Sequence, residues 1–201
     1  MKKLYRKKIK NLESELNFWY TKDYPNYLDK DYSKIYKSTT GKKIRLLIIK
    51  ELIVMQKDVC AYCEKPIKEA DVEHWDSNFK KVDGFKWDNL FYVDIAVNRQ
   101  KNNNQPKLLK PDSKNYDPFE LLDYNLVTNK YIANSKLPTN KQKIVEKDIF
   151  ILGLNLYSTE RASELMGLEM QYQTFNKFEK MIDVSIPIDE NKERFKTAKQ
   201  F

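Results

Sequence analysis

Apolar residues recur at helical spacing in several stretches of the chain. Between residues 42 and 56 they fall three or four positions apart, which predicts a buried helix. Farther along, Thr139-Asn140-Lys141-Gln142 is a capping signature, and apolar residues at positions 145, 149, 152 and 156 continue it as a helix that faces a core. Two more helices are predicted, one from about Thr159 to Met181 and a short one near Asn11 to Tyr20.

Other segments have the character of short strands. Residues 60–67 and 70–75 fit the two strands of a hairpin, and a polar loop follows over 76–86. From Trp87 an apolar stretch passes into an amide-rich run, which predicts a short helix ending before Pro106. Residues 126–128 can pair with 130–132 across a turn. Helices combined with hairpins predict an α+β fold.

Composition narrows the class of protein. The chain has 201 residues, 41% of them apolar, which is enough for one ordinary domain without disulfides. Its 37 basic residues outnumber its 29 acidic ones for a formal charge of +8. This charge suits a partner that carries phosphates or an acidic protein surface, although solubility alone also explains it. No stretch approaches the ~18 apolar residues of a membrane span, and no signal peptide is apparent, so we expect a soluble, cytoplasmic protein with no membrane contact.

A series of short motifs surrounds His74, which is the only histidine. In chain order they are Cys60 and Cys63, Glu73-His74-Trp75, Trp87-Asp88-Asn89-Leu90 and Asn98-Arg99-Gln100-Lys101. This series resembles the HNH endonucleases, in which a hairpin and a helix, the ββα-metal fold, hold one divalent ion. In particular it looks like the defence-associated branch that includes the PtuB component of Septu systems and retron-associated HNH effectors. Asp117-Pro118, Leu152-Gly153-Leu154-Asn155 and Arg161 extend the resemblance over roughly residues 45 to 175.

The chemistry of phosphodiester hydrolysis suits these residue types. A base must take a proton from water, and an imidazole, with an ordinary pKa of about 6.5, is available for this in His74. A hard cation, Mg²⁺ or Mn²⁺, prefers oxygen ligands, which Glu73 and Asn98 can supply. The resemblance implies that Asn89 orients the loop and His74. Arg99 and Lys101 are candidates for binding nucleic acid, although a solvated helix lysine explains Lys101 equally well.

The cysteines depart from the family's pattern. The resembling proteins usually bind a structural Zn²⁺ with two Cys-x-x-Cys pairs, but the positions of the second pair are Asp94 and Val97 here. Two thiolates alone cannot complete a four-coordinate zinc site, so a structural Zn²⁺ is doubtful. Three interpretations stay open for Cys60 and Cys63: small buried apolar residues, a weak site completed by Asp94 or water, or a redox pair.

We therefore expect a basic N-terminal segment over 1–40, an HNH nuclease module over 41–107 buttressed by an N-terminal helix, and a mainly helical extension over 108–201. The basic N-terminus can follow a phosphate backbone or dock on a partner. The expected function is metal-dependent cleavage of nucleic acid, DNA rather than RNA, by the effector subunit of a prokaryotic anti-phage complex. The resemblance implies an ABC-type ATPase as the partner, and we expect it to dock near Ile149 to Phe178.

A rival reading is a catalytically inactive subunit that binds nucleic acid or assists assembly and descends from an HNH nuclease. The incomplete zinc site supports it, as does glutamate at position 73, where aspartate is commoner. Retention of the base, both candidate metal ligands and Asn89 favours an enzyme.

Overall fold

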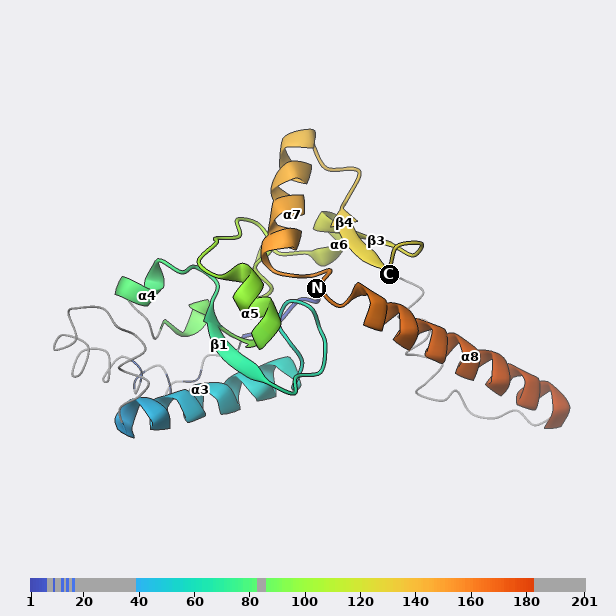
Figure 1. The fold of residues 1–201 in the computed structure, drawn as a ribbon, viewed down its shortest axis with the longest axis horizontal. Coiled ribbons are helices and arrows are strands. Elements are labelled where there is room, and N and C mark those ends of the chain that lie inside the picture. Colours follow the sequence, from blue (N-terminus) through green and yellow to red (C-terminus); the bar gives the residue numbers. More distant parts are fainter. Residues whose placement is uncertain are drawn as a thin grey trace.

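The computed structural model describes residues 1–6, 9, 12, 14, 16, 39–82 and 86–182. Its fold is α+β, with helices packed around two small antiparallel sheets (Figure 1). The elements follow in the order α3 (Thr39–Gln56), β1 (Ala70–His74), α4 (Phe79–Val82), the 3-10 helix η2 (Trp87–Asn89), β2 (Leu90–Asp94), α5 (Ile95–Lys101), α6 (Pro118–Leu121), β3 (Leu122–Asn125), β4 (Lys130–Ala133), α7 (Thr139–Ile151) and α8 (Ser158–Ile182). Within the described residues, no helix is long and apolar enough to span a membrane.

The first sheet pairs β1 with β2, in antiparallel register from Ala70 opposite Asp94 to His74 opposite Leu90. The predicted strand at 70–75 is therefore confirmed, but its predicted partner, 60–67, is wrong. Residues 61–63 form a turn, and an isolated bridge joins Val59 to Pro66. The prediction failed because β2 is covered on both faces, and such a strand appears in the sequence as a continuous apolar run that also fits a buried helix.

Helix α3 runs along this sheet (Figure 1). The apolar positions Ile44, Ile48 and Leu52 are buried and belong to one cluster with Val72 and Leu90. The predicted helix is confirmed, but it is buried on one face only. Its other face exposes the apolar side chains Leu46, Leu47 and Val54.

Helix α5 begins directly after β2, because Asp94 ends the strand and caps the helix. One carboxylate oxygen of Asp94 accepts hydrogen bonds from the backbone amides of Ala96 and Val97. The predicted short helix thus exists, but it begins only at Ile95. Strands β1 and β2 followed by α5 give a ββα arrangement, which is the part of the fold that positions the candidate site.

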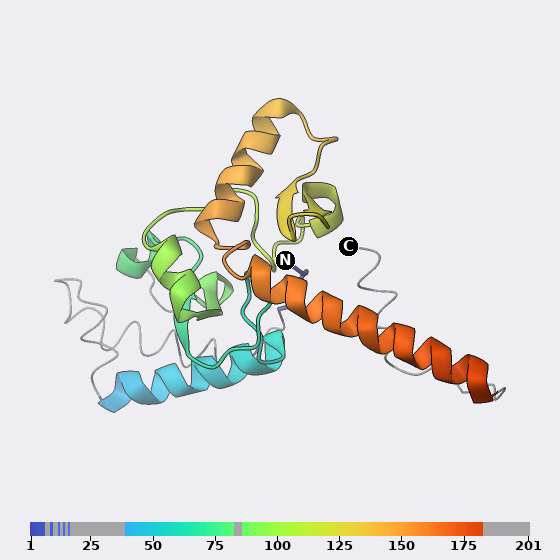
Figure 2. The same cartoon turned by 45° about the vertical axis from the view of Figure 1, so that its right-hand side comes forward.

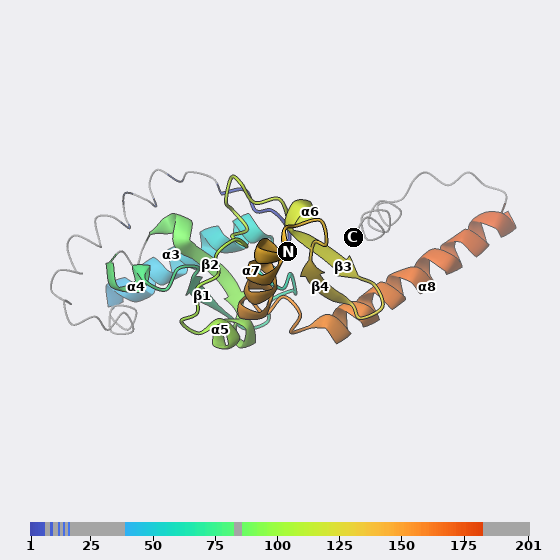
Figure 3. The same cartoon turned by 90° about the horizontal axis from the view of Figure 1, so that it is seen from above.

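The C-terminal part contains the second sheet and the two long helices. A hairpin is present, but the predicted first strand over 126–128 is wrong, and only the second strand, over 130–132, is confirmed. Residues 126–129 form the turn, in which the Asn125 side chain accepts from the backbone amides of Val127 and Thr128. The capping signature at Thr139 does not form a side-chain cap, since Pro138 occupies the N-cap position. The two predicted helices are confirmed as α7 and α8. Figures 1, 2 and 3 all show α8 extending away from the other described elements.

The basic N-terminus packs onto the module as far as it is described. Lys3 donates to two backbone carbonyls, of Lys114 and Tyr116. Arg6 pairs with Asp112, and its guanidinium also donates to the carbonyl oxygens of Trp87 and Leu90. These two cations are therefore engaged within the chain itself. Lys7, Lys8 and Lys10 lie outside the described residues, as does the predicted helix at 11–20 except for Leu12, Ser14 and Leu16, which are helical.

Candidate functional site

A cleft of about 1020 Å³ opens between α3, β1 and α5, with Lys80 of α4 at its border. The candidate base and both candidate metal ligands line it: Glu73 and His74 from β1, and Asn98 from α5. Its remaining lining residues are Lys42, Arg45, Leu46, Ile49, Asp71, Val72, Lys80, Arg99, Asn102 and Asn103. Residues more than twenty positions apart in the sequence thus meet in one cleft.

Glu73 and His74 lie at the end of β1. A regular strand directs adjacent side chains to opposite faces, yet both of these line the cleft. The strand ends at His74 and the chain bends at Trp75 and Asp76, so the end of the strand opens toward the cleft. His74 lines the cleft but is itself buried, with only 1% of the residue exposed.

Asn89 holds the bend that follows His74. Its side-chain oxygen accepts from the backbone amide of Asp76 at 2.8 Å, and its side-chain nitrogen donates to the carbonyl of Asp76 at 3.0 Å. The backbone of Trp75 also donates to the carbonyl of Asn89. Because the Asn89 side chain is buried, these bonds are shielded from water. The loop after the candidate base is thereby fixed to η2.

Lys101 is buried inside the protein, whereas the sequence suggested a lysine exposed on the surface of its helix. It is fully buried, and its ammonium donates to a carboxylate oxygen of Glu73 and to the carbonyl of His74, both at 2.8 Å. A group buried in this way cannot bind a phosphate in the cleft, and it is not a solvated helix lysine either. Lys101 instead connects α5 to the end of β1 and supplies the positive charge that the buried Glu73 carboxylate requires.

Burial has the largest effect on the pKa values of both Glu73 and Lys101. It raises the pKa of Glu73 above its ordinary value, against the opposite influence of the Lys101 and Lys80 ammonium groups. Burial likewise lowers the pKa of Lys101, against the influence of Glu73. Lys80 lies at 3.9 Å from the second carboxylate oxygen of Glu73. The Glu73 carboxylate is therefore paired with ammonium groups from two elements, α4 and α5.

Asn98 faces β1 beside Asp71, a residue that the sequence argument missed. The Asn98 side-chain nitrogen donates to a carboxylate oxygen of Asp71 at 3.4 Å. The other oxygen of Asp71 accepts from Arg45 of α3 at 2.8 Å. The sequence contained one signal for this residue, because Asp71 precedes Glu73 by two positions and a strand places such residues on one face. Arg45 gave no such signal, since its relation to β1 depends on the packing of α3.

Cationic side chains lie along the border of the cleft. Lys42 and Arg45 belong to α3, Lys80 to α4 and Arg99 to α5. Three helices therefore contribute positive charge to the lining of the cleft. Arg99 is exposed and lies where the sequence argument needs a cation for nucleic acid. Phosphate groups are attracted to such a surface largely without regard to base sequence.

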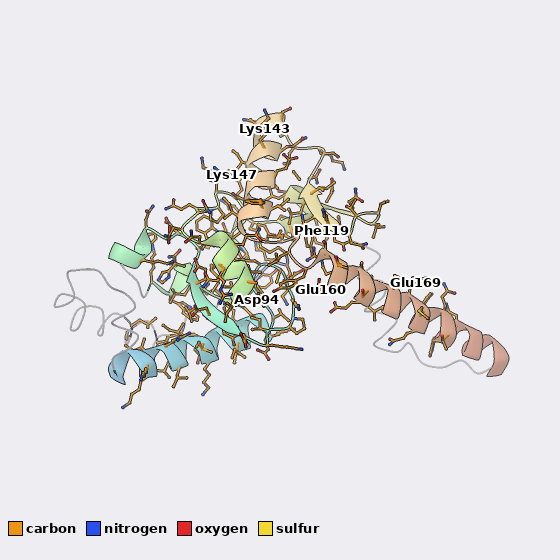
Figure 4. The ribbon with its side chains drawn as sticks, in the orientation of Figure 1. Asp94, Phe119, Lys143, Lys147, Glu160 and Glu169 are labelled. Atoms are coloured by element: carbon orange, nitrogen blue, oxygen red, sulfur yellow. The ribbon has the colours of Figure 1, made fainter. Side chains whose placement is uncertain are left out.

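The cysteine pair lies next to the start of α5. Cys60 and Cys63 are buried, and the Cys60 sulfur accepts from the backbone amide of Asp94 at 3.5 Å. Val97 belongs to the same apolar cluster. The Asp94 carboxylate caps α5 and accepts from the Tyr157 hydroxyl at 2.8 Å, near the start of α8, where Figure 4 shows Asp94 and Glu160. Asp94 is thus engaged in holding α5 and the turn before α8.

The two thiols differ in their affinity for protons. Burial alone would raise the pKa of Cys60, but hydrogen bonds from the Cys63 thiol and from backbone amides lower it to about 7. Donation of that hydrogen bond raises the pKa of Cys63, and burial adds to the effect. Among the described residues, no group of three or more His, Cys, Asp and Glu side chains is placed to hold a metal ion. Cys60 and Cys63 therefore form a buried pair of thiols joined by a hydrogen bond.

The other residues that carry the resemblance support the module from the C-terminal side. Asp117 caps α6. Asn155 exchanges hydrogen bonds with the backbone of Tyr131 in β4, and Arg161 donates to the carbonyl of Leu154. Gly153 has a positive φ, and a Cβ there would lie 3.6 Å from Val97, so this turn packs directly against α5. None of these residues lines the cleft.

No protein-family model matches this chain, and no curated protein matches it in sequence.

Proposed function

We propose that this protein is a metal-dependent endonuclease of the HNH kind that hydrolyses phosphodiester bonds in DNA. One observation carries the proposal: Glu73, His74 and Asn98 line a single cleft whose border carries cations from three elements. A carboxylate, an imidazole and an amide are the groups that this hydrolysis needs, and the cations suit the charged backbone of the substrate.

The residues of the cleft fit a hard divalent ion such as Mg²⁺ or Mn²⁺. Glu73 and Asn98 offer oxygen ligands, and such ions keep several waters and complete their shell with substrate phosphates. A divalent ion at Glu73 would compete with the Lys101 ammonium, 2.8 Å from one carboxylate oxygen, and with the Lys80 ammonium, 3.9 Å from the other. A bound ion would supply positive charge next to the phosphate that is cleaved.

The chain's own residues then have separate roles. His74 takes a proton from the attacking water, and Asn89 keeps the loop behind it in place. Arg99 and Lys42 bind phosphates on either side of the cleft. Lys101 balances the charge of Glu73 and ties α5 to β1. RNA cleavage would use the same groups.

A non-catalytic binding subunit is the second candidate function. It is favoured by the Lys101 ammonium on Glu73 and by the deep burial of His74, because both groups must become accessible for hydrolysis. Under either function, the resemblance supports a place in a prokaryotic anti-phage complex with an ABC-type ATPase.

Nicking of supercoiled plasmid in Mg²⁺ or Mn²⁺ tests the proposal. The wild-type chain, alone or with the ATPase, should nick the plasmid, and His74→Ala should lower the rate by ~10² to 10⁴-fold without loss of DNA binding. Lys143→Ala, which changes an exposed residue of α7, is the control (Figure 4). Binding without nicking by the wild type identifies the non-catalytic subunit. Activity of His74→Ala above a tenth of wild type removes His74 from the mechanism.

A further inference from the structure

Asp71 lies in the cleft between two side chains from different helices. One carboxylate oxygen accepts from Arg45 of α3 at 2.8 Å, and from the backbone amide of Val72 at 3.1 Å. The other oxygen accepts from the Asn98 side chain of α5 at 3.4 Å. The carboxylate is therefore held on one side and directed toward Asn98 on the other.

This contact selects one orientation of the Asn98 amide. An amide side chain has a donor end and an acceptor end, and an ionised carboxylate can only accept. Asp71 must therefore meet the nitrogen of Asn98, which directs the carbonyl oxygen away from Asp71. A hard cation binds the carbonyl oxygen of an amide and is repelled by its nitrogen end. With the amide turned by 180°, Asn98 would be no ligand.

The two residue pairs that join β1 to α5 have parallel roles. Asp71 and Glu73 are two positions apart on one face of β1, and Asn98 and Lys101 are three positions apart on one face of α5. Glu73 meets Lys101 at 2.8 Å, and Asp71 meets Asn98. The first pair fixes the candidate carboxylate ligand, and the second fixes the candidate amide ligand.

We propose that Asp71, held by Arg45, is a positioning residue that orients the Asn98 amide so that its oxygen binds the divalent ion. This inference rests on the proposed function, because it assigns a role toward the ion that the nuclease would use. Asp71 itself acts through Asn98. Residues that orient metal ligands in this way typically contribute about 10- to 100-fold to metal affinity.

A double-mutant cycle on Mn²⁺ binding tests the assignment. The dissociation constant is measured on the full chain by electron paramagnetic resonance, without DNA, for wild type, Asp71→Ala, Asn98→Asp and the double variant. Asp71→Ala should weaken Mn²⁺ binding about 10- to 100-fold. A carboxylate at position 98 offers an oxygen in either orientation, so removal of Asp71 from the Asn98→Asp chain should cost no affinity. Glu69→Gln, which removes an exposed negative charge just before β1, should bind Mn²⁺ like the wild type.

Each outcome either supports or overturns the assignment of Asp71 as a positioning residue. Equal losses in both backgrounds would overturn the assignment, because Asp71 would then act on the ion directly. Unchanged binding by Asp71→Ala would also overturn it. If the wild type binds Mn²⁺ and nicks DNA in either of these cases, only the assignment of Asp71 fails. If the wild type neither binds Mn²⁺ nor nicks DNA, the proposed function fails as well. Asp71→Ser, which is too short to reach Asn98, replaces Asp71→Ala should that variant unfold.

Discussion

At the scale of single residues, the buried pair of Glu73 and Lys101 has the largest consequences. Two charges taken out of water lose their hydration, and their mutual attraction compensates for this only while both partners are present. The Lys101 ammonium also donates to the carbonyl of His74, so the pair holds the end of β1 against α5. Stability and the geometry of the cleft therefore depend on the same contact.

Removal of the ammonium should destabilise the chain in a pH-dependent way. Lys101→Met leaves the buried Glu73 carboxylate with only the Lys80 ammonium, at 3.9 Å, which should cost up to about 3 to 5 kcal/mol at neutral pH. Burial already raises the pKa of Glu73, and loss of Lys101 raises it further. The folded variant thus binds a proton more tightly than the unfolded one, so its stability is regained as the pH falls and lost as the pH rises through the raised pKa.

Urea unfolding of Lys101→Met between mildly acidic and neutral pH checks this prediction. The matched control is Lys147→Met, at an exposed lysine of α7 (Figure 4). A Lys101→Met chain as stable as the control at neutral pH would mean that the buried pair contributes nothing.

The cysteine pair yields a second prediction at this scale. We expect the purified protein to carry substoichiometric zinc or none, because Asp94 is engaged in capping α5 and Val97 is apolar. Cys60→Ala and Cys63→Ala should then each cost about 1 to 2 kcal/mol, as for small buried side chains. Elemental analysis and thermal unfolding measure the two quantities. One tightly held zinc per chain that is lost on Cys60→Ser would contradict the expectation, and Asp94 would be the next residue to mutate.

At the scale of elements, the sequence predicted the long amphipathic helices well and the central sheet poorly. Periodicity located α3, α7 and α8. Helices α3 and α7 each have one face against a core, whereas the described part of α8 contributes no residue to the clusters of buried residues. Periodicity failed at β2, whose side chains are buried on both faces. The pairing of β1 with β2 joins segments separated by η2 and α4, and no local signal in the chain specifies such a pairing.

In the candidate site too, the sequence predicted the residues that short motifs identify and missed a feature that depends on long-range packing. The motifs that carry the resemblance, together with the chemistry of their residue types, were enough to name Glu73, His74, Asn89 and Asn98. The burial of Lys101 was missed because position 101 follows a polar, amide-rich run and therefore appears solvated. Only the packing of α5 on β1 shows that this lysine faces inward.

Asn89 acts at the scale of elements, since its side chain joins η2 to the bend after β1. Asn89→Ala removes two hydrogen bonds and leaves the partly buried backbone of Asp76 without them, which should cost about 1 to 3 kcal/mol. It should also slow plasmid nicking, because the loop behind His74 loosens. Asn134 is a matched control: it is a buried asparagine whose side chain holds the carbonyl of Phe119, away from the cleft.

Thermal unfolding and plasmid nicking of both asparagine variants measure the outcome. Asn134→Ala should lose comparable stability and keep full activity. Equal activity of the two variants at a temperature where both are folded would show that Asn89 has a structural role only.

At the scale of the whole molecule, α8 stands apart from the other described elements. It extends away from the module in every view (Figures 1, 2 and 3). Tyr172 and Phe175, which lie within the range Ile149 to Phe178 where docking is expected, are half-buried in the structure. Among the α8 side chains that the structure describes, the large apolar ones that are exposed are Met166 and Met170, at 67% and 69% exposure. They lie one turn apart and form a short apolar strip, and methionine adapts readily to a partner surface.

This strip is where we expect the ABC-type ATPase of the proposed complex to dock. Met166→Asp combined with Met170→Asp places two charges on an interface that should be apolar, so it should abolish co-purification with the ATPase. The cleft is formed by other elements, so plasmid nicking by the isolated chain should be unchanged. Lys143→Asp combined with Lys147→Asp, on the exposed side of α7, changes charge elsewhere and should leave the complex intact (Figure 4). Assembly by the methionine variant, together with release by the lysine variant, would instead place the docking surface on α7.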